Sequence, residues 1–364
     1  MTSSGSISIR KELLVDLINK SIPETFRGLG AIIMHKNGEI FRYSNGNIPE
    51  LNFSYNENVL FDMASLTKPI ITATLAMKLL DANKIGLDDP ISSYLKEKNG
   101  VYFDKFSMKN LLSHSSGLIP SYPLYLNGTT REDYLKTIRA ISTGATPYTK
   151  EEYSDLNYIL LGLILEEITG KTLNELATEE ILKPLKMNSS GFKPSMDKKL
   201  IAPTEKTEER GQIWGEVHDE NAYYLGGIAG HAGFFSTLDD MAKYVVGFNE
   251  SKLFSRKTKE LMVTPVNEFL GGNFGLGWMV KNSRSEKSGP SFGYTAFMGD
   301  YSSYGTIGHT GFTGTSIVMD LKRNLTVVIL CNRVYPTREN NLMLRFRRIF
   351  HNAVYNSIND EEVG

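Results

Sequence analysis

The chain has 364 residues, with 40 lysines and arginines against 41 aspartates and glutamates, which gives a formal net charge of −1 at pH 7. This balance leaves no basic excess for nucleic acid and no strong acidic field, so we expect small, roughly neutral ligands. No segment approaches the ~20 apolar residues of a membrane span. Residues 1–11 lack the apolar core of a signal peptide, and we therefore expect a cytoplasmic protein.

The first part of the chain predicts a helix and then a β-hairpin. An amphipathic pattern near residues 9–18 favours the helix. Two apolar runs, 29–35 and 40–43, flank the tetrapeptide Lys36-Asn37-Gly38-Glu39, and Asn-Gly between two such runs is typical of a hairpin turn.

The middle of the chain, from about residue 63 to 262, predicts mainly helices. Apolar residues recur at helical spacing in 65–80, 158–168, 173–185 and 238–246. Gly170 follows the second of these runs, as a helix-ending glycine does. Ser236-Thr237-Leu238-Asp239 predicts a capping box at the start of the last run.

Strand patterns return beyond about Gly272, in 276–280, 305–309, 315–320 and 325–331, and residues 342–358 predict a closing helix. Strands at both ends with helices between them predict an α/β fold of the α+β type. We expect an antiparallel sheet built from both chain ends, with flanking helices and an inserted, mainly helical region. The expected domains are 1–62 with 272–364 for the sheet and 63–271 for the helices, with the active site at their junction.

Two isolated features of the sequence favour structural interpretations. The only cysteine, Cys331, lies in an apolar run, which excludes an internal disulfide and favours a packed thiol over a reactive one. The basic run Arg345-Phe346-Arg347-Arg348 is interpreted as a solvated helix face. Neither feature carries a function in this interpretation.

Ser65 is the candidate nucleophile, because it begins a long apolar stretch and is followed three residues later by Lys68. If the chain is helical from Leu66, the two side chains share one face and the ammonium group reaches the hydroxyl. The same spacing follows four other serines, Ser8, Ser93, Ser190 and Ser195. Only Ser65 precedes a run that is apolar nearly all round, which indicates a buried helix. Taken alone, the pattern fits a nucleophile and a plain helix cap equally well.

Two more motifs, Tyr153-Ser154-Asp155 and His309-Thr310-Gly311, lie before a helical run and at the end of a strand-like run. With Ser65 and Lys68, and with segments 111–118, 225–237 and 332–336, they make the chain resemble the serine β-lactamase and penicillin-binding protein superfamily over nearly its whole length. The resemblance is to the class C branch, which also holds esterases and D-alanyl-D-alanine peptidases, and the middle motif is of the tyrosine type.

The resemblance implies that Ser65 is acylated and that Lys68 and Tyr153 move protons. A serine hydroxyl needs a base as it attacks, and neither lysine nor tyrosine is a base at neutral pH with a free pKa near ~10. We expect burial and the positive end of the helix to lower the pKa of Lys68.

The same resemblance implies the groups that hold the substrate. The backbone N–H groups of Ser65 and Phe312 correspond to the oxyanion hole, where fixed donors stabilise the developing negative charge. The substrate-binding residues implied are Asp155, His309, Thr310 and Gly311.

Two of these residues depart from the family pattern. Asp155 stands where many relatives have asparagine, whose amide donates to a substrate carbonyl, and an ionised carboxylate cannot donate. His309 stands where β-lactamases usually have lysine, so a full positive charge is absent at pH 7 unless the imidazole is protonated. Both departures favour esters over β-lactams.

The sequence therefore predicts a serine hydrolase that hydrolyses small carboxylic esters through an acyl-enzyme. The close alternative is a D-alanyl-D-alanine carboxypeptidase or a weak β-lactamase, and a non-catalytic ligand-binding module is the remote one. Metal-dependent hydrolysis through His218 and Asp219 is disfavoured, because the spacing of that polar segment matches none of the metal-protease patterns. His114 and His231 are interpreted as histidines that hold loops. We expect no metal ion and no other cofactor.

Overall fold

The computed structural model describes residues 8–95, 103–282 and 293–358. Residues 1–7, on which the signal-peptide interpretation partly depends, and Lys96, which follows Ser93 at the Ser-x-x-Lys spacing, lie outside these ranges. Within the part of the chain described, no helix is both long enough and apolar enough to cross a membrane.

One antiparallel sheet of seven strands dominates the described residues, in the order β3-β2-β1-β12-β11-β10-β9. Its strands are β1 (Gly28–His35), β2 (Gly38–Ile48), β3 (Phe53–Ser54), β9 (Met279–Val280), β10 (Ile307–Thr310), β11 (Ser316–Asp320) and β12 (Leu325–Cys331). Strands β1 and β12 pair along their length, from Leu29 with Cys331 to His35 with Leu325. The prediction of a sheet built from both chain ends is therefore confirmed.

The hairpin predicted around residues 36–39 is present, and a second one lies near the C-terminal end of the sheet. His35 pairs with Gly38, and the two loop residues between them, Lys36 and Asn37, have φ of 48° and 66°. Positive φ at both positions matches the twist of the flanking strands, and asparagine tolerates it well. The second hairpin joins β11 to β12 through residues 321–324, with Asp320 paired to Leu325.

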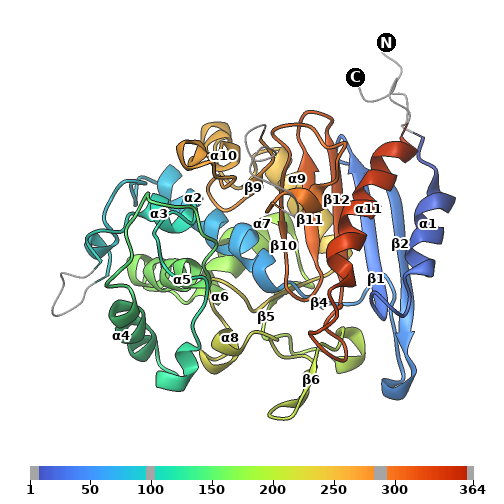
Figure 1. The fold of residues 1–364 in the computed structure, drawn as a ribbon, viewed down its shortest axis with the longest axis horizontal. Coiled ribbons are helices and arrows are strands. Elements are labelled where there is room, and N and C mark those ends of the chain that lie inside the picture. The colour runs from blue at the N-terminus through green and yellow to red at the C-terminus, as the bar shows by residue number, and fades with distance from the viewer. Residues whose placement is uncertain (1–7, 96–102, 283–292, 359–364) are drawn as a thin grey trace.

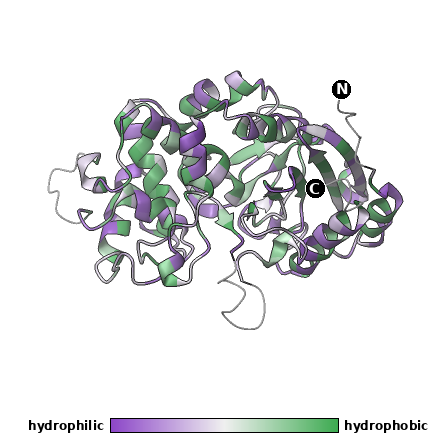
Figure 2. Ribbon diagram, turned by 90° about the horizontal axis from the view of Figure 1, so that it is seen from above, coloured by the Kyte–Doolittle hydropathy of each residue, from purple (hydrophilic) through white to green (hydrophobic). Residues whose placement is uncertain are grey.

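Helices cover both faces of the sheet. Side chains alternate between the two faces along each strand, so neighbouring residues of β1 pack against different helices. Ala31 and Ile33 pack with α1 (Lys11–Lys20) and α11 (Leu342–Ser357), whereas Ile32 packs toward α9 (Leu238–Asn249). Figure 1 shows α1 and α11 side by side on one face. Figure 2 shows the hydrophobic strands between helices of mixed polarity.

The middle of the chain is mainly helical, as predicted. Its helices and helical turns are η2 (Ala64–Leu66), η3 (Lys68–Ala73), α2 (Thr74–Asp81), η4 (Ile91–Ser93), α3 (Met108–Leu112), η5 (Leu124–Asn127), α4 (Arg131–Ile141), α5 (Asp155–Thr169), α6 (Leu173–Ala177), η6 (Thr178–Leu182), α7 (Lys183–Leu185), η7 (Lys198–Leu200), α8 (Glu220–Tyr224) and α10 (Arg256–Val263). Helix α5 ends at Gly170, which has a φ of 68°. Residues 156–165 of this helix are all buried, which explains why its sequence is apolar nearly all round.

Short strands in this region have no counterpart in the sequence-based predictions. Strand β8 (Phe234–Ser236) pairs with β4 (Phe61–Asp62) and β5 (Gly191–Phe192), and β6 (Lys206–Thr207) pairs with β7 (Gly211–Gln212). Because Ser236 ends β8, Thr237 caps α9 by accepting a hydrogen bond from the backbone N–H of Asp240. The capping box predicted from Ser236 is therefore wrong by one residue.

The largest hydrophobic cluster contains residues of both regions, such as Ile32 and Val328 from the sheet and Ile71 and Leu160 from the helices. The division at residues 62/63 and 271/272 stays a prediction. Cys331 is buried, its thiol lies 3.8 Å from the sulfur of Met343, and burial raises its pKa to about 12. This environment confirms a packed, unreactive thiol.

Candidate active site

Ser65 lies on a tight turn between β4 and the buried helix of residues 68–81. The preceding residue, Ala64, has a φ of 47°, which is unfavourable for a residue with a side chain and is typical of functional turns. The buried carboxylate of Asp62 holds this turn, accepting hydrogen bonds from the backbone N–H groups of Ala64 (2.8 Å) and His218 (2.7 Å). The turn therefore presents Ser65 in a fixed position.

Lys68 is fully buried and its ammonium group lies against Ser65. It donates a hydrogen bond to Ser65 Oγ at 2.9 Å and another to the carbonyl of His231 at 3.1 Å, and it forms an ion pair with Asp155 Oδ1 at 2.7 Å. The predicted contact between Ser65 and Lys68 is present.

The predicted low pKa of Lys68 is wrong. Burial lowers the pKa of Lys68, but the charge of Asp155 and the hydrogen bonds to Asp155 and Tyr153 outweigh burial, and the pKa is raised. An opposite charge at 2.7 Å favours the protonated form. Lys68 therefore remains an ammonium ion at neutral pH, because Asp155 carries a carboxylate where an asparagine has a neutral amide.

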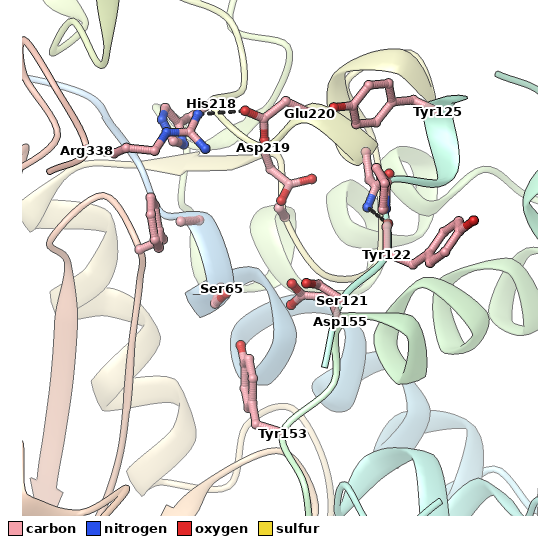
Figure 3. A pocket seen from close by; sticks show the side chains of 15 residues that line it. Ser65, Ser121, Tyr122, Tyr125, Tyr153, Asp155, His218, Asp219, Glu220 and Arg338 are labelled. Atoms are coloured by element: carbon pink, nitrogen blue, oxygen red, sulfur yellow. Dashed lines mark hydrogen bonds and ion pairs between the residues drawn. The ribbon is translucent and has the colours of Figure 1, made fainter. Parts of the chain in front are cut away.

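The hydroxyl of Tyr153 points toward Ser65 (Figure 3). Burial raises the pKa of the phenol, and the charge of Lys68 opposes that rise. The ring packs between those of His114 and His309, with centroids 4.6 and 5.8 Å away. These contacts fix the direction of the hydroxyl.

His114 and His231 each form a contact that holds a loop, in agreement with their interpretation. His114 Nδ1 accepts from the backbone N–H of Ser154 at 3.1 Å, which anchors the loop between Tyr153 and Asp155. His231 Nε2 lies 2.7 Å from Asp219 Oδ1.

On the opposite side of the site, the end of β10 and the following turn lie against the Ser65 turn. A Cβ at Gly311 would lie 2.6 Å from the carbonyl oxygen of Met63, so only glycine permits this approach. Thr313 donates to the carbonyl of Asp62 at 2.8 Å, and Thr315 donates to that of Met63 at 3.1 Å. The two segments that carry the predicted oxyanion donors are thus fastened together.

His309 is buried beneath Tyr153, with only 1% of its surface exposed. Its Nδ1 lies 2.9 Å from the carbonyl oxygen of Thr310, which assigns the proton to that nitrogen. Burial and the charge of Lys68 lower the pKa of His309 to about 3. The imidazole is therefore neutral at physiological pH and offers no charge to a substrate carboxylate.

Phe312 follows Gly311 on the exposed edge of the turn. Among the described residues, its backbone N–H is paired with no acceptor, whereas its carbonyl accepts from Arg333 Nε at 2.8 Å. Phe312 is 47% exposed, and its ring stacks on His218 and lies under the guanidinium group of Arg333.

A pocket of about 450 Å³ opens in front of Ser65 (Figure 3). It is lined by Ala64, Ser65, Ser121, Tyr122, Pro123, Tyr125, Tyr153, Asp155, His218, Asp219, Glu220, Asn221, Ala232, Phe312 and Arg338. Of the predicted site residues, the pocket brings together Ser65, Tyr153, Asp155 and Phe312. Lys68, His309, Thr310 and Gly311 do not line this pocket, and Lys68 and His309 are buried. The proton-transfer role of Lys68 and the substrate contacts of the other three stay predictions.

The sequence-based interpretation missed Asp219 and Arg338 as pocket residues. Asp219 belongs to the polar segment that was considered for a metal; His231 and the N–H of Ala222 outweigh the effect of burial and hold its pKa below the usual range. In the same segment His218 Nε2 bonds to Glu205 at 2.9 Å, and Glu205 also pairs with Arg338 at 2.6 Å. His218 and Asp219 thus bond to different partners, Glu205 and His231, as expected of a polar loop beside the site.

Comparisons with known proteins agree with this architecture. A family model described as Beta-lactamase matches residues 20–351. A putative D-alanyl-D-alanine carboxypeptidase of Escherichia coli K12 is 31% identical over 331 residues, covering 81% of this chain and 74% of the relative. An N-acetylmuramyl-L-alanine amidase of Bacillus subtilis 168 is 30% identical over 379 residues, covering 91% of this chain and 82% of the relative.

Among solved structures, EstCE1, a hydrolase with promiscuous acyltransferase activity, has a similar fold. The TM-score is 0.70 at 21% identity, over 92% of this chain and 97% of that one. The chain belongs to the β-lactamase family, within the serine β-lactamase and penicillin-binding protein superfamily. It is therefore a serine hydrolase of the β-lactamase and penicillin-binding protein type.

Proposed function

We propose that this protein hydrolyses small carboxylic esters through an acyl-enzyme on Ser65. The observation that carries the proposal is the hydrogen bond of 2.9 Å from the buried Lys68 ammonium group to Ser65 Oγ, beside the Tyr153 hydroxyl and at the floor of an open pocket. A serine held in this way is positioned to attack a carbonyl carbon, provided that its proton has a path to leave.

Tyr153 supplies that path as a relay. Ser65 already accepts a hydrogen bond from Lys68, so its own proton is free to pass to the Tyr153 oxygen as Oγ bonds to the ester carbon. Because Tyr153 is a neutral phenol, it takes the Ser65 proton and gives its own phenolic proton to the leaving alkoxide oxygen in one concerted transfer, as the ester C–O bond breaks. In the second half, water attacks the acyl carbon and gives a proton to Tyr153, while the phenolic proton moves in the same transfer to Ser65 Oγ as the acyl bond breaks. The Lys68 charge favours the partial negative charge on the phenol oxygen in both halves.

The developing oxyanion lies between the backbone N–H groups of Ser65 and Phe312. These donors are fixed before reaction, because the Gly311–Thr315 turn and the Ser65 turn are hydrogen-bonded to each other.

The preference for esters follows from charge. Asp155 is paired with Lys68 and offers no N–H to the amide carbonyl of a penicillin or peptide side chain. His309 is neutral and offers no cation to a substrate carboxylate. Simple esters need neither group.

A D-alanyl-D-alanine carboxypeptidase is the second candidate. The E. coli relative carries that description, and the pocket contains one guanidinium group, Arg338, that could meet a terminal carboxylate. Arg338 is already paired with Glu205 and Glu220, at 2.6 Å each, which weakens its attraction for another anion.

Intact-protein mass spectrometry separates these candidates. The protein and its Ser65→Ala variant are incubated separately with a fluorophosphonate, a short-chain p-nitrophenyl ester, benzylpenicillin and a D-Ala-D-Ala peptide. We expect a fluorophosphonate adduct and ester turnover that both require Ser65. Cleavage of the peptide with acylation by penicillin would favour the carboxypeptidase, and absence of any adduct on the folded protein would refute a serine hydrolase mechanism.

A further inference from the structure

A buried arginine from the C-terminal helix contacts the turn that carries the Phe312 N–H group. Arg347, on α11, is 3% exposed, and its Nη2 donates to the carbonyl oxygens of Gly311 and Thr315, each at 2.9 Å. The backbone N–H of Gly311 also donates to the carbonyl of Thr315, at 2.7 Å. The guanidinium group therefore closes the turn at its base.

The Gly311 carbonyl belongs to the same peptide group as the Phe312 N–H. In a trans peptide the C=O and N–H bonds point in opposite directions, so a carbonyl directed at Arg347 directs the N–H away from α11. Strand β9 pairs only with Ile307 and Gly308 of β10, so among the described residues no strand pairs with the later part of this edge. The Phe312 N–H is thereby directed to the edge where Phe312 lines the pocket.

The charge of Arg347 also acts on this donor. Burial lowers the pKa of Arg347 to about 10, so it stays protonated at neutral pH, and within the described ranges it forms no ion pair with a carboxylate. A cationic donor at a carbonyl oxygen withdraws electron density from the amide and strengthens its N–H as a donor. An unpaired buried charge is costly, and an anion forming on the other side of the peptide group gives it a counterpart.

We propose that Arg347 is a positioning residue of this hydrolase, which orients and polarises the Phe312 N–H through the Gly311 carbonyl so that the peptide group stabilises the oxyanion. This inference rests on the proposed function, because it assigns Arg347 to the oxyanion hole of that site. It replaces the interpretation of Arg347 as part of a solvated helix face, which still describes Arg345 and Arg348.

The test compares Arg347→Met and Arg347→Lys with Arg348→Met. Arg348 is the next residue on the helix, but its side chain is 43% exposed and pairs with Asp300 at the surface, so its loss controls for a change in α11. The rate of fluorophosphonate labelling is measured by intact mass, with kcat and KM for a p-nitrophenyl ester and a melting curve for each variant.

Arg347→Met is expected to slow labelling and lower kcat by about 10-fold or more, since losing one oxyanion donor has effects of that size or larger. KM should change little, because the ground-state ester lacks the full negative charge. Arg347→Lys keeps the charge on a shorter stem and should fall between Arg347→Met and the wild type. Arg348→Met should match the wild type.

Wild-type labelling and kcat in a folded Arg347→Met variant would overturn the inference. If that variant does not fold, Arg347→Lys decides, and a wild-type rate in it would overturn the inference equally. If the wild-type protein itself is not labelled, the proposed function fails instead, so the two failures are distinct.

Discussion

The two sides of the pocket contribute different kinds of group. On the helical side, the ionisable side chains of Tyr153 and Asp155 line the pocket, and the buried ammonium group of Lys68 lies behind them against Ser65. On the strand side, the imidazole of His309 is buried and neutral, and the group proposed to act is the backbone N–H of Phe312, a pocket residue whose N–H has no acceptor among the described residues. The protons of the proposed reaction move on the first side, and the negative charge is held from the second.

This division has a physical reason. Proton transfer needs groups whose charge changes, and these must be balanced by neighbours, as Asp155 balances Lys68. An oxyanion needs donors that do not lose their protons, and the Phe312 N–H, whose peptide group is held by Arg347 through the Gly311 carbonyl, meets that need without titrating.

The largest expected effect is that of Tyr153→Phe, which removes the relay and leaves the ring in place. We expect kcat for a p-nitrophenyl ester to fall about 10²- to 10⁴-fold, the usual contribution of general acid–base catalysis. Stability should change little, because the ring contacts with His114 and His309 remain. Tyr148→Phe, which removes the hydroxyl of an exposed tyrosine, is the matched control. Near-normal turnover by Tyr153→Phe would show that the proton leaves by another path.

Lys68→Met should slow acylation by about 10²-fold or more, since the phenol loses the neighbouring charge that favours it as a relay. It also leaves the Asp155 carboxylate without its cation, and we expect a loss of about 1–3 kcal/mol in the free energy of unfolding. The double variant Lys68→Met/Asp155→Asn should recover that stability without recovering the rate. Urea unfolding and labelling kinetics measure the two effects separately, and recovery of the rate would contradict the role given to Lys68.

The sequence predicts those features of this site that depend on residues close to each other along the chain. Ser65 and Lys68 are three residues apart, so helical geometry alone brings them together. The hairpins and the apolar helix α5 also follow from local patterns. The raised pKa of Lys68 does not, because its cause is Asp155, which is distant in sequence and arrives with another helix.

Arg347 shows why a local pattern can also mislead. A run of three arginines within four residues indicates a solvated face, yet helical spacing places Arg347 on the same face as Met343 and Phe350, which are buried. Arg348 lies on the outer face and pairs with Asp300. Only the position of the β10 turn explains why the inner arginine is tolerated there.

Asp155→Asn should shift the pH dependence of the reaction. Burial lowers the pKa of Lys68 and the charge of Asp155 raises it, so removing that charge lets the effect of burial prevail and the pKa falls. Lys68 then loses its proton at lower pH, and the alkaline limb of kcat/KM should move to lower pH than in the wild type. The measurement is a pH–rate profile of both proteins with one ester. An unmoved alkaline limb would show that the limb reports another group.

The smallest expected effect tests the neutrality of the strand side. The pKa of His309 is lowered to about 3 by burial, Lys68 and Arg347, so KM should show no inflection near pH 6.5 that depends on this residue. The unfolded chain takes up a proton below about pH 6.5 that the folded protein excludes, so stability falls as pH falls from there toward 3. Between pH 7 and 5 this one group accounts for about 2 kcal/mol at most.

His309→Gln should therefore lose less stability than the wild type over that interval, by up to the same ~2 kcal/mol. His114 and His351 are also buried with lowered pKa values, but both remain in the variant and cancel in the comparison. Urea unfolding at pH 7 and pH 5 gives the difference. Equal losses in the two proteins would mean that His309 is protonated in the folded state near pH 5. The strand side would then offer a cation to a substrate carboxylate, and the argument from charge for a preference for esters would fail.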